Sequence, residues 1–295
     1  MGDDAPVLAD VIDLLRCPVC EESLSLGDGL VRCPGGHSFD IARQGYVNLV
    51  PGRADSPEMV EARDAFLRAG HFRPLSESLA EEARAVAAAA GAPASPGSAT
   101  WAAHTAGSIV DLGAGAGHHL AAVLDALPPT RGIAIDASPA ALRRAARSHP
   151  RATAVGADAW KPLPLRDGIA TSVLSVFAPR NATEIGRILA PSGTLLAVTP
   201  TTRHLHELVG PLGLLSVPDD KEDRLDAQLS AHFELTDRRT IEHAMFLTRD
   251  ESAQVVRMGP SAWHVDEQSV NERLAALPDP LAVTASVTLS RFVVR

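Results

Sequence analysis

All three cysteines of the 295-residue chain lie in one short segment near its N-terminus, together with a histidine. Their order is Cys17-x2-Cys20-x12-Cys33-x3-His37, which makes two close pairs of possible metal ligands. Close pairs on tight turns let thiolate and imidazole donors converge on one tetrahedral zinc ion. Four protein ligands leave no open coordination position, so the spacing predicts a structural zinc site and not a catalytic one.

An alternative is that Cys17 and Cys20 form a redox pair, with the other two ligands incidental. A cytosolic C-x-x-C redox pair is expected beside a βαβ pattern, and this segment has none. An odd number of cysteines also argues against a disulfide framework. The sequence SLGDGLVR between the pairs predicts a β-hairpin that turns at Asp28-Gly29. Two ligand pairs carried by a hairpin form a zinc ribbon.

A second segment that could do chemistry is IVDLGAGAGHH, residues 109–119. Gly113, Gly115 and Gly117 separate a short apolar strand from a helical segment, as expected of a turn whose backbone approaches a ligand closely. Asp111 precedes these glycines. The pattern G-x-G-x-G lacks the spacing of a dinucleotide fingerprint, so S-adenosylmethionine fits this loop better than NAD.

Acidic residues follow the next two predicted strands. Asp136 ends the strand GIAID, where a carboxylate can accept hydrogen bonds from both ribose hydroxyls. Asp158 and Ala159 follow the next strand and are expected at the edge of an adenine. A glycine-rich turn alone can be a packing feature. Combined with acidic residues at consecutive strand ends, it predicts a nucleoside crevice at the C-terminal edge of a parallel sheet.

These residues need a framework that brings several strand ends together. From Ser108 onward, short apolar strands alternate with helical segments, which predicts a Rossmann-like α/β domain. Residues 282–294 are rich in Val and Thr and predict a terminal antiparallel strand. Residues 57–70 and 73–90 predict helices, because apolar residues recur at three- and four-residue spacing. The predicted organisation is a small zinc-ribbon domain at 1–50, a helical segment and linker at 51–107, and the Rossmann-like domain at 108–295.

Composition limits the class of protein. Apolar residues make up 45% of the chain, enough for a sizeable core, and the formal net charge is −9. No apolar run reaches the roughly 18–20 residues of a membrane helix. The N-terminal sequence MGDDAP lacks the basic start of a signal peptide. We therefore expect a cytoplasmic protein with no membrane partner.

Six segments match one known family in order: CPVC, RCPGGHSFDIARQGYVNLV, MVEARDAFLRAGHFRPL, VDLGAGAGHH, VFAPRN and TPTTRHLHEL. Through them the chain resembles the 23S ribosomal RNA guanine-N1 methyltransferases over nearly its whole length. That family has an N-terminal zinc ribbon followed by a Rossmann-like methyltransferase domain. The closer likeness is to the actinobacterial branch that confers resistance to tylosin and mycinamicin.

The resemblance implies an S-adenosylmethionine-dependent enzyme that methylates guanine N1 in a hairpin of 23S rRNA domain II, near the peptide exit tunnel. It implies zinc binding by the four ribbon ligands and places Phe72, His119, Leu120 and His204 beside the cofactor. It also implies a homodimer and resistance to macrolides. A small-molecule methyltransferase with a purely structural ribbon stays open as an alternative.

Guanine N1 carries a proton that a base or hydrogen-bonding group should take. His204 and Glu207 are candidates by their location after the predicted fifth strand. All three cysteines are committed to metal, which excludes covalent catalysis by cysteine. VFAPR stands where enzymes that methylate exocyclic amines carry an NPPY-type motif.

Some basic and aromatic residues are candidates for RNA contact. Arginines could grip the RNA backbone, although nearby acidic residues also fit a solvated helix face. They are Arg43, Arg53, Arg63, Arg68 and Arg73. Tryptophans could stack a base and are equally expected in packing: Trp101, Trp160 and Trp263.

Overall fold

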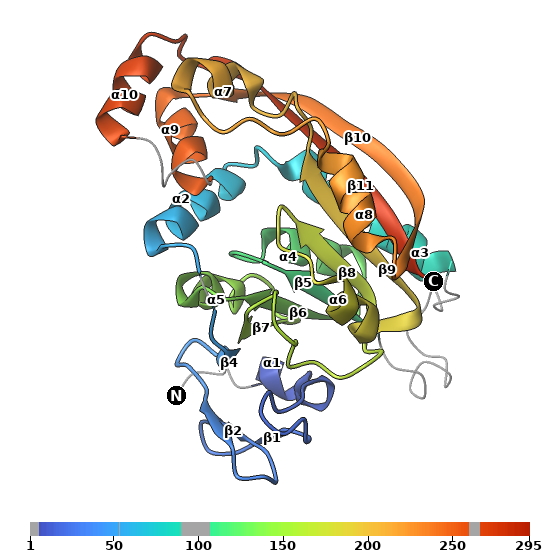
Figure 1. Cartoon of the computed structure of the whole chain (residues 1–295). Helices are drawn as coiled ribbons and strands as arrows, with labels where there is room; N and C mark the ends of the chain where they lie inside the picture. The colour runs from blue at the N-terminus through green and yellow to red at the C-terminus, as the bar shows by residue number, and fades with distance from the viewer. Residues whose placement is uncertain (1–5, 53, 90–106, 260–265) are drawn as a thin grey trace.

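A computed structural model describes residues 6–52, 54–89, 107–259 and 266–295. An eight-stranded sheet forms its centre, with the order β10-β11-β9-β8-β5-β6-β7-β4 (Figure 1). The strands are β4 (Val47–Val50), β5 (Ser108–Leu112), β6 (Arg131–Asp136), β7 (Ala152–Ala157), β8 (Ala170–Val176), β9 (Leu189–Pro200), β10 (Phe233–Leu247) and β11 (Leu281–Val294).

The direction of the strands follows the predicted Rossmann-like pattern. The six strands from β9 to β4 pair in parallel, and β11 pairs antiparallel with β9. The predicted α/β fold with a terminal antiparallel strand is therefore confirmed. The sequence analysis missed β10, which pairs antiparallel with β11 along its whole length. Its burial alternates only weakly, because one face of this edge strand is largely exposed.

Ten α-helices are present in the described ranges. They are α1 (Pro6–Ala9), α2 (Pro57–Arg68), α3 (Arg73–Ala89), α4 (His118–Ala126), α5 (Pro139–Ala145), α6 (Ala182–Ile188), α7 (His206–Leu212), α8 (Lys221–Leu229), α9 (Arg249–Met258) and α10 (Glu267–Ala275). The helices predicted over 57–70 and 73–90 correspond to α2 and α3. None of these described helices has both the length and the apolar character of a membrane span.

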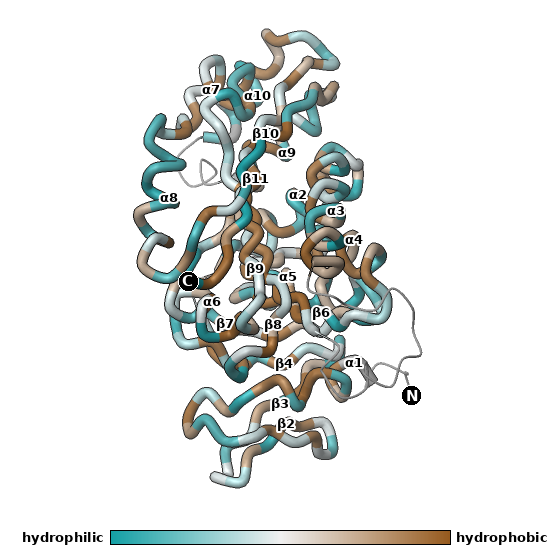
Figure 2. Tube along the Cα trace, turned by 90° about the vertical axis from the view of Figure 1, so that its right-hand side faces the viewer, coloured by the Kyte–Doolittle hydropathy of each residue, from teal (hydrophilic) through white to brown (hydrophobic). Residues whose placement is uncertain are grey.

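Two apolar clusters cover the two faces of the sheet. One contains residues of α3 and α4, and the other contains residues of the ribbon, α6 and α8. Adjacent positions of β5 supply opposite clusters, Ile109 to the first and Val110 to the second, as the two-residue period of a strand requires. Figure 2 shows the strands in the middle of the molecule mostly brown and the outlying α8 mostly teal.

The N-terminal residues form a separate three-stranded sheet of β1 (Ser25–Leu26), β2 (Leu30–Arg32) and β3 (Ser38–Asp40). The amide of Gly27 donates to the Leu30 carbonyl at 2.8 Å, which closes the predicted hairpin. After β3 the chain enters β4, which pairs with β7 in the large sheet. The ribbon therefore leads directly into the edge of the Rossmann-like sheet; the exact domain limits stay a prediction.

The far end of the β10–β11 hairpin extends beyond the sheet. Pairing of β11 with β9 stops at Val287 and Pro200, whereas pairing with β10 continues to Leu281 and Leu247. Helices α7 and α9 pack near this extension, and α2 packs against α9 (Figure 1). This arrangement brings α2 to the C-terminal edge of the parallel strands, where the predicted cofactor residues lie.

Candidate zinc site and cofactor site

The four predicted zinc ligands come together in the ribbon, and their ligand atoms all lie within 4.8 Å of one another. Sγ of Cys33 is 3.6 Å from Sγ of Cys20 and 3.3 Å from Nδ1 of His37, and Sγ of Cys17 is 3.6 Å from the same nitrogen. Bonds of about 2.0–2.3 Å to one tetrahedral zinc separate ligand atoms by about 3.3–3.8 Å. The three thiols are free of disulfides, so these residues fit a closed zinc site.

Short backbone turns hold each pair of ligands. The amide of Glu21 donates to the Cys17 carbonyl at 2.9 Å, and the amide of Gly36 donates to the Cys33 carbonyl at 3.1 Å. Cys17 and Cys33 are also buried in the same apolar cluster as the adjoining face of the large sheet. Metal binding at these cysteines would therefore support the packing between the ribbon and the Rossmann-like domain.

The glycine loop follows β5 at residues 113–117. Gly113 has φ of 67° and Gly117 has φ of 82°, a region that side chains with a Cβ seldom adopt. Space is also short: a Cβ on Gly113 would lie 2.7 Å from the Ala178 Cβ, and one on Gly117 would lie 2.5 Å from the Ser148 Oγ. The loop thus packs its backbone at Gly113 directly against the turn after β8, and Gly117 is the N-cap of α4.

Asp136 and the glycine loop lie within hydrogen-bonding distance. The amide of Gly115 donates to Oδ2 of Asp136 at 2.9 Å, and the amide of Ser138 donates to Oδ1 at 2.8 Å. Burial raises the pKa of Asp136, although these two amides act in the opposite direction. Each oxygen keeps a second lone pair, so the carboxylate can still accept ribose hydroxyls.

Asp111 lies inside β5 and is only 2% exposed. Burial, and then the nearby charge of Asp136, raises the pKa of Asp111 to about 8. The side chain is therefore mainly protonated and neutral at pH 7, so it does not offer a second negative charge beside Asp136.

Asp158 and Ala159 lie in the turn after β7, beside the exit of the ribbon. Oδ1 of Asp158 accepts the amide of Trp160 at 3.0 Å, and Nζ of Lys161 donates to the Pro51 carbonyl at 3.1 Å. The carbonyl of Trp160 accepts Nδ2 of Asn181 at 3.2 Å, which joins this turn to the segment after β8. The indole of Trp160 is largely exposed.

His119 and Leu120 lie in the first turn of α4, but their side chains turn toward the core. Nδ1 of His119 is 2.9 Å from Oγ of Ser76 on α3. Burial, and then the neighbouring His118, lowers the pKa of His119 to about 4. Leu120 is fully buried and packs in the cluster of α3 and α4. A cofactor contact by either residue stays a prediction.

Three aromatic rings from distant segments form a cluster at the C-terminal edge: Phe72, Phe177 and His204. The ring centroid of Phe177 is 6.0 Å from that of Phe72 and 5.7 Å from that of His204. The centroids of Phe72 and His204 are 5.9 Å apart. Phe72 is buried, whereas Phe177 is 43% exposed. The sequence analysis named Phe72 and His204 but missed Phe177, whose signal was its place in VFAPRN.

The backbone near this cluster is strained. Phe177 has φ of 53° and Leu205, next to His204, has φ of 58°. Such a conformation costs a bulky residue on the order of 1–3 kcal/mol and persists only where the surroundings enforce it. The amide of Phe177 donates to the Val198 carbonyl at 3.2 Å, and the amide of Leu205 donates to the Thr284 carbonyl at 2.8 Å. Neighbouring strands therefore hold both residues in place.

One hydrogen bond decides which ring nitrogen of a neutral His204 carries the proton. Its Nδ1 accepts the backbone amide of Ser286 at 3.2 Å, so a neutral ring carries its proton on Nε2. Burial, and then the charge of nearby His243, lowers the pKa of His204 to about 4. At neutral pH, Nε2 of His204 therefore carries a hydrogen, acts as a hydrogen-bond donor and cannot accept a proton.

The other candidate base, Glu207, is held by β11. Its Oε2 accepts the amide of Thr284 at 2.9 Å and its Oε1 accepts the hydroxyl of Thr284 at 2.6 Å. Burial raises the pKa of Glu207, but these hydrogen bonds outweigh it and the net shift is downward. Its carboxylate thus joins α7 to β11, which argues for a structural role.

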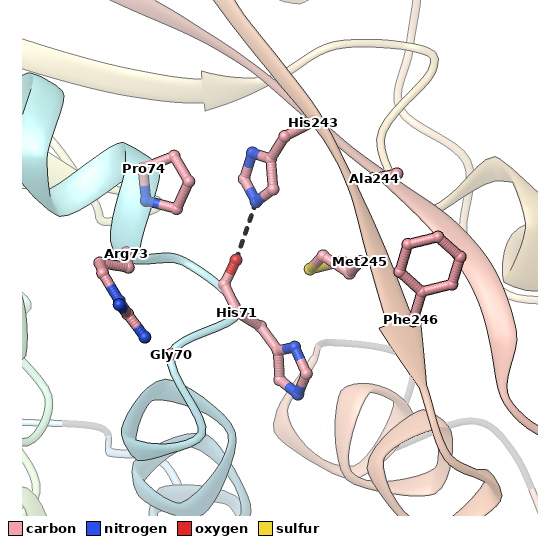
Figure 3. Close-up of a pocket in the computed structure, with 8 residues that line it drawn as sticks. All are labelled: Gly70, His71, Arg73, Pro74, His243, Ala244, Met245 and Phe246. Atoms are coloured by element: carbon pink, nitrogen blue, oxygen red, sulfur yellow. Dashed lines mark hydrogen bonds between the residues drawn. The ribbon is translucent and has the colours of Figure 1, made fainter.

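A pocket of about 330 Å³ lies between β10 and the segment that joins α2 to α3 (Figure 3). His243 donates from Nε2 to the carbonyl of His71 at 2.8 Å, and Nε2 of His71 is 2.9 Å from Oε1 of Glu251. Arg73 lines the opposite wall in Figure 3. These contacts fix the turn that carries Phe72.

Asp64 anchors α2 next to the glycine loop. Its carboxylate is 2.8 Å from Nε2 of His118 and accepts Nε of Arg68 and of Arg144, each at 3.1 Å. The sequence analysis considered Asp64 only as one of the acidic residues of a solvated helix face, which is wrong for this residue because it is buried. Its signal was an aspartate on the apolar face of a predicted helix, four residues after the buried Val60.

The arginines predicted to grip RNA have different environments. Arg63 pairs with Asp55 at 2.7 Å and donates to the Met258 carbonyl. The side chain of Arg63 lies next to Gly115 of the glycine loop. Arg68 pairs with Asp64 but stays largely exposed, and Arg43 and Arg73 are exposed as well. Outside the described residues lie Arg53, Trp101 and Trp263.

Comparison with known proteins gives matches for both parts of the chain. Residues 15–55 match the family described as RlmA, N-terminal, a zinc ribbon, and residues 109–193 match a methyltransferase domain family. A solved S-adenosylmethionine-dependent methyltransferase from Geobacter sulfurreducens, in complex with S-adenosyl-L-homocysteine, is 16% identical. The superposition covers 64% of this chain and 85% of the Geobacter sulfurreducens chain, with a TM-score of 0.40.

Relatives cover nearly the whole chain. The 23S rRNA (guanine(748)-N(1))-methyltransferase of Streptomyces fradiae is 49% identical over 285 residues, 95% of this chain and 97% of the relative. A Micromonospora griseorubida protein provisionally named as a 23S rRNA (guanine-N(1)-)-methyltransferase is 49% identical over 96% of this chain and 98% of its own length. The chain therefore belongs to the family of 23S rRNA guanine-N1 methyltransferases.

Proposed function

We propose that this protein transfers a methyl group from S-adenosylmethionine to N1 of a guanine in a hairpin of 23S rRNA domain II, near the peptide exit tunnel. The names of relatives 49% identical over nearly the whole chain support this activity. One structural observation carries it furthest. The closed metal site, the glycine loop with Asp136, and the aromatic cluster belong to one continuous framework, because β4 joins the ribbon to the sheet.

The described residues contribute binding and positioning. S-adenosylmethionine supplies a methyl group activated by its positive sulfur. Gly113, Gly115, Gly117 and Asp136 would hold its nucleoside and methionine parts, with Asp158 at the adenine. Transfer then requires guanine N1 in line with the methyl group, and such alignment supplies much of the rate. Because the target lies in a paired stem or stacked loop, the base must leave its stack to reach this edge.

The two candidate bases are reassigned in this proposal. His204 presents a donor hydrogen and Glu207 is held by Thr284. We assign His204 to binding, as a neutral hydrogen-bond donor at the edge of the site, and Glu207 to holding α7. The proton of guanine N1 then leaves to solvent or to an RNA group. Zinc, held by the four ribbon ligands, would fix the surface that meets the RNA.

The biological setting belongs to the same proposal. Methylation near the exit tunnel would weaken binding of macrolides such as tylosin or mycinamicin, so we infer a role in macrolide resistance. The proposed substrate is ribosomal RNA, so the enzyme would act in the cytoplasm. The homodimer implied by the family resemblance stays a prediction that sedimentation of the purified protein can check.

Transfer of tritiated methyl groups tests the activity. Wild-type protein with labelled S-adenosylmethionine is expected to label protein-free 23S rRNA, whereas Asp136→Ala is expected to lose most labelling. Labelling of a macrolide but not of RNA would favour a small-molecule methyltransferase and overturn the proposal.

A further inference from the structure

Phe177 combines exposure with an unusual backbone. It is one of seven large apolar residues that stay exposed in the described part of the chain. It is also one of three non-glycine residues there with positive φ. Among the residues that the structure describes, no other shares both properties. A second positive-φ residue, Leu205, directly follows His204, whose ring contacts Phe177.

The turn that carries Phe177 is fixed on several sides. Its amide bonds to the Val198 carbonyl, and Nη2 of Arg180 donates to the same oxygen at 3.2 Å. The carbonyl of Arg180 accepts Nε2 of Gln228. A rigid turn therefore holds a large apolar ring that stays partly exposed, on a strained backbone that packing alone would not favour.

The ring of Phe177 lies beside the glycine loop. Ala178 follows Phe177 and abuts Gly113, the first glycine of the cofactor loop. Phe177 therefore lies beside the loop that, in the proposed function, holds the methyl donor. Its contacts with Phe72 and His204 are tilted, with interplanar angles of 44° and 32°. Because Phe177 stays 43% exposed despite these contacts, part of its surface is available to another planar group.

We propose that Phe177 is the stacking platform that positions the target guanine, with the flipped-out base lying against its ring. This inference rests on the proposed function and names the residue that fixes the substrate. A base outside its stack exposes two apolar faces, and an aromatic side chain replaces the lost stacking. The rigid turn supplies the accuracy that in-line attack at N1 requires.

Four variants test the inference. Phe177→Ala removes the ring, whereas Phe177→Tyr and Phe177→Trp keep an aromatic face. Phe177→Gly removes the ring and accepts the positive φ without strain. Leu235→Ala is the matched control. Leu235 is similarly exposed, at 39%, but it lies near the start of β10, where it pairs with Phe292.

The measurements separate base positioning from folding. We expect Phe177→Ala and Phe177→Gly to lower kcat/KM for 23S rRNA by about 10- to 100-fold. Affinity for S-adenosylhomocysteine should change less than about 2-fold. Tyr and Trp should retain activity within about 3-fold of wild type. The melting temperature of Phe177→Gly should not fall below that of Phe177→Ala, because glycine relieves the backbone strain.

A fluorescent base reports stacking directly. The probe is an RNA hairpin with 2-aminopurine at the methylated position. Its fluorescence should be quenched by wild type and by Phe177→Trp, and it should remain brighter with Phe177→Ala. Unchanged kcat/KM in Phe177→Ala, or an equal loss of cofactor affinity, would overturn the role of Phe177 while the proposed function stands. A wild-type protein that fails to methylate RNA would instead overturn the proposed function, and this inference with it.

Discussion

The carboxylate of Asp64 lies 2.8 Å from Nε2 of His118, which joins the middle of α2 to the first residue of α4. Because His118 directly follows the glycine loop, this contact and the bond from Arg144 hold α2 across the predicted cofactor site. Burial raises the pKa of Asp64, but the hydrogen bonds and charges of His118 and Arg68 outweigh it and lower the pKa overall.

Asp64→Asn keeps the shape of this side chain and removes its charge. We expect the free energy of unfolding to fall by about 1–3 kcal/mol and affinity for S-adenosylhomocysteine to weaken by about 10-fold. Urea unfolding and calorimetric titration measure both. Because the folded pKa of Asp64 is lowered, its contribution is present above the ordinary carboxyl pKa and is lost as the pH falls through the folded value.

Asp220→Asn is the control for this prediction. Asp220 pairs with Arg224 one turn along the chain, and both side chains are at least half exposed. Such surface pairs contribute little, so a change within about 0.5 kcal/mol is expected. Equal effects of Asp64→Asn and Asp220→Asn would show that Asp64 does not anchor α2.

Asp111→Asn should be tolerated, because the raised pKa already keeps Asp111 mainly neutral at pH 7. A raised carboxyl pKa means that wild-type stability declines as the pH rises from the ordinary value toward 8. The stability of Asp111→Asn relative to wild type should therefore improve with pH in that window, by up to about 1.4 kcal/mol per pH unit. Unfolding measured at pH 5 and pH 8 checks this. A difference that does not depend on pH would contradict it.

Much of this fold could be predicted from local signals. The zinc ligands are fixed by spacing on two short turns, and the glycine loop and Asp136 are fixed by successive parallel strand ends. Periodicity predicted α2 and α3 because each has one continuous apolar face.

The missed features depend on tertiary contacts. Strand β10 has a mixed pattern of burial because it is an edge strand, so alternation could not reveal it. In sequence, Phe177 differs from other apolar residues only by its place in VFAPRN, and its backbone angle and exposure become visible only in the structure. Likewise, the hydrogen bond from Ser286 to His204 joins residues 82 positions apart.

Removal of zinc should affect RNA recognition more than cofactor binding. Cys17→Ser breaks one ligand of a site whose metal stabilises a segment too small for a large core. We expect loss of bound zinc and at least about 10-fold weaker RNA binding, with a smaller change in cofactor affinity. Val19→Ala, which alters an exposed residue between the two first ligands, is the matched variant. Equal losses for RNA and cofactor would contradict separate roles of the two parts.

His204 should stay neutral throughout the working pH range, because burial and nearby His243 lower its pKa to about 4. His204→Ala is therefore expected to lower kcat/KM without moving any inflection of the pH profile between pH 5.5 and 8.5, a range in which an ordinary histidine with a pKa of about 6.5 would titrate. Nitrogen NMR should find the proton on Nε2. A wild-type inflection near pH 6.5 that vanishes in the variant would identify His204 as a base instead.

The most direct test of the account is primer extension on 23S rRNA after incubation with protein and S-adenosylmethionine. A methyl group on guanine N1 blocks Watson–Crick pairing and stops reverse transcriptase. The account predicts one strong stop at a guanine in the domain II hairpin, dependent on cofactor and absent with Asp136→Ala. Labelled rRNA without such a stop, or no labelling of rRNA, would contradict methylation of guanine N1.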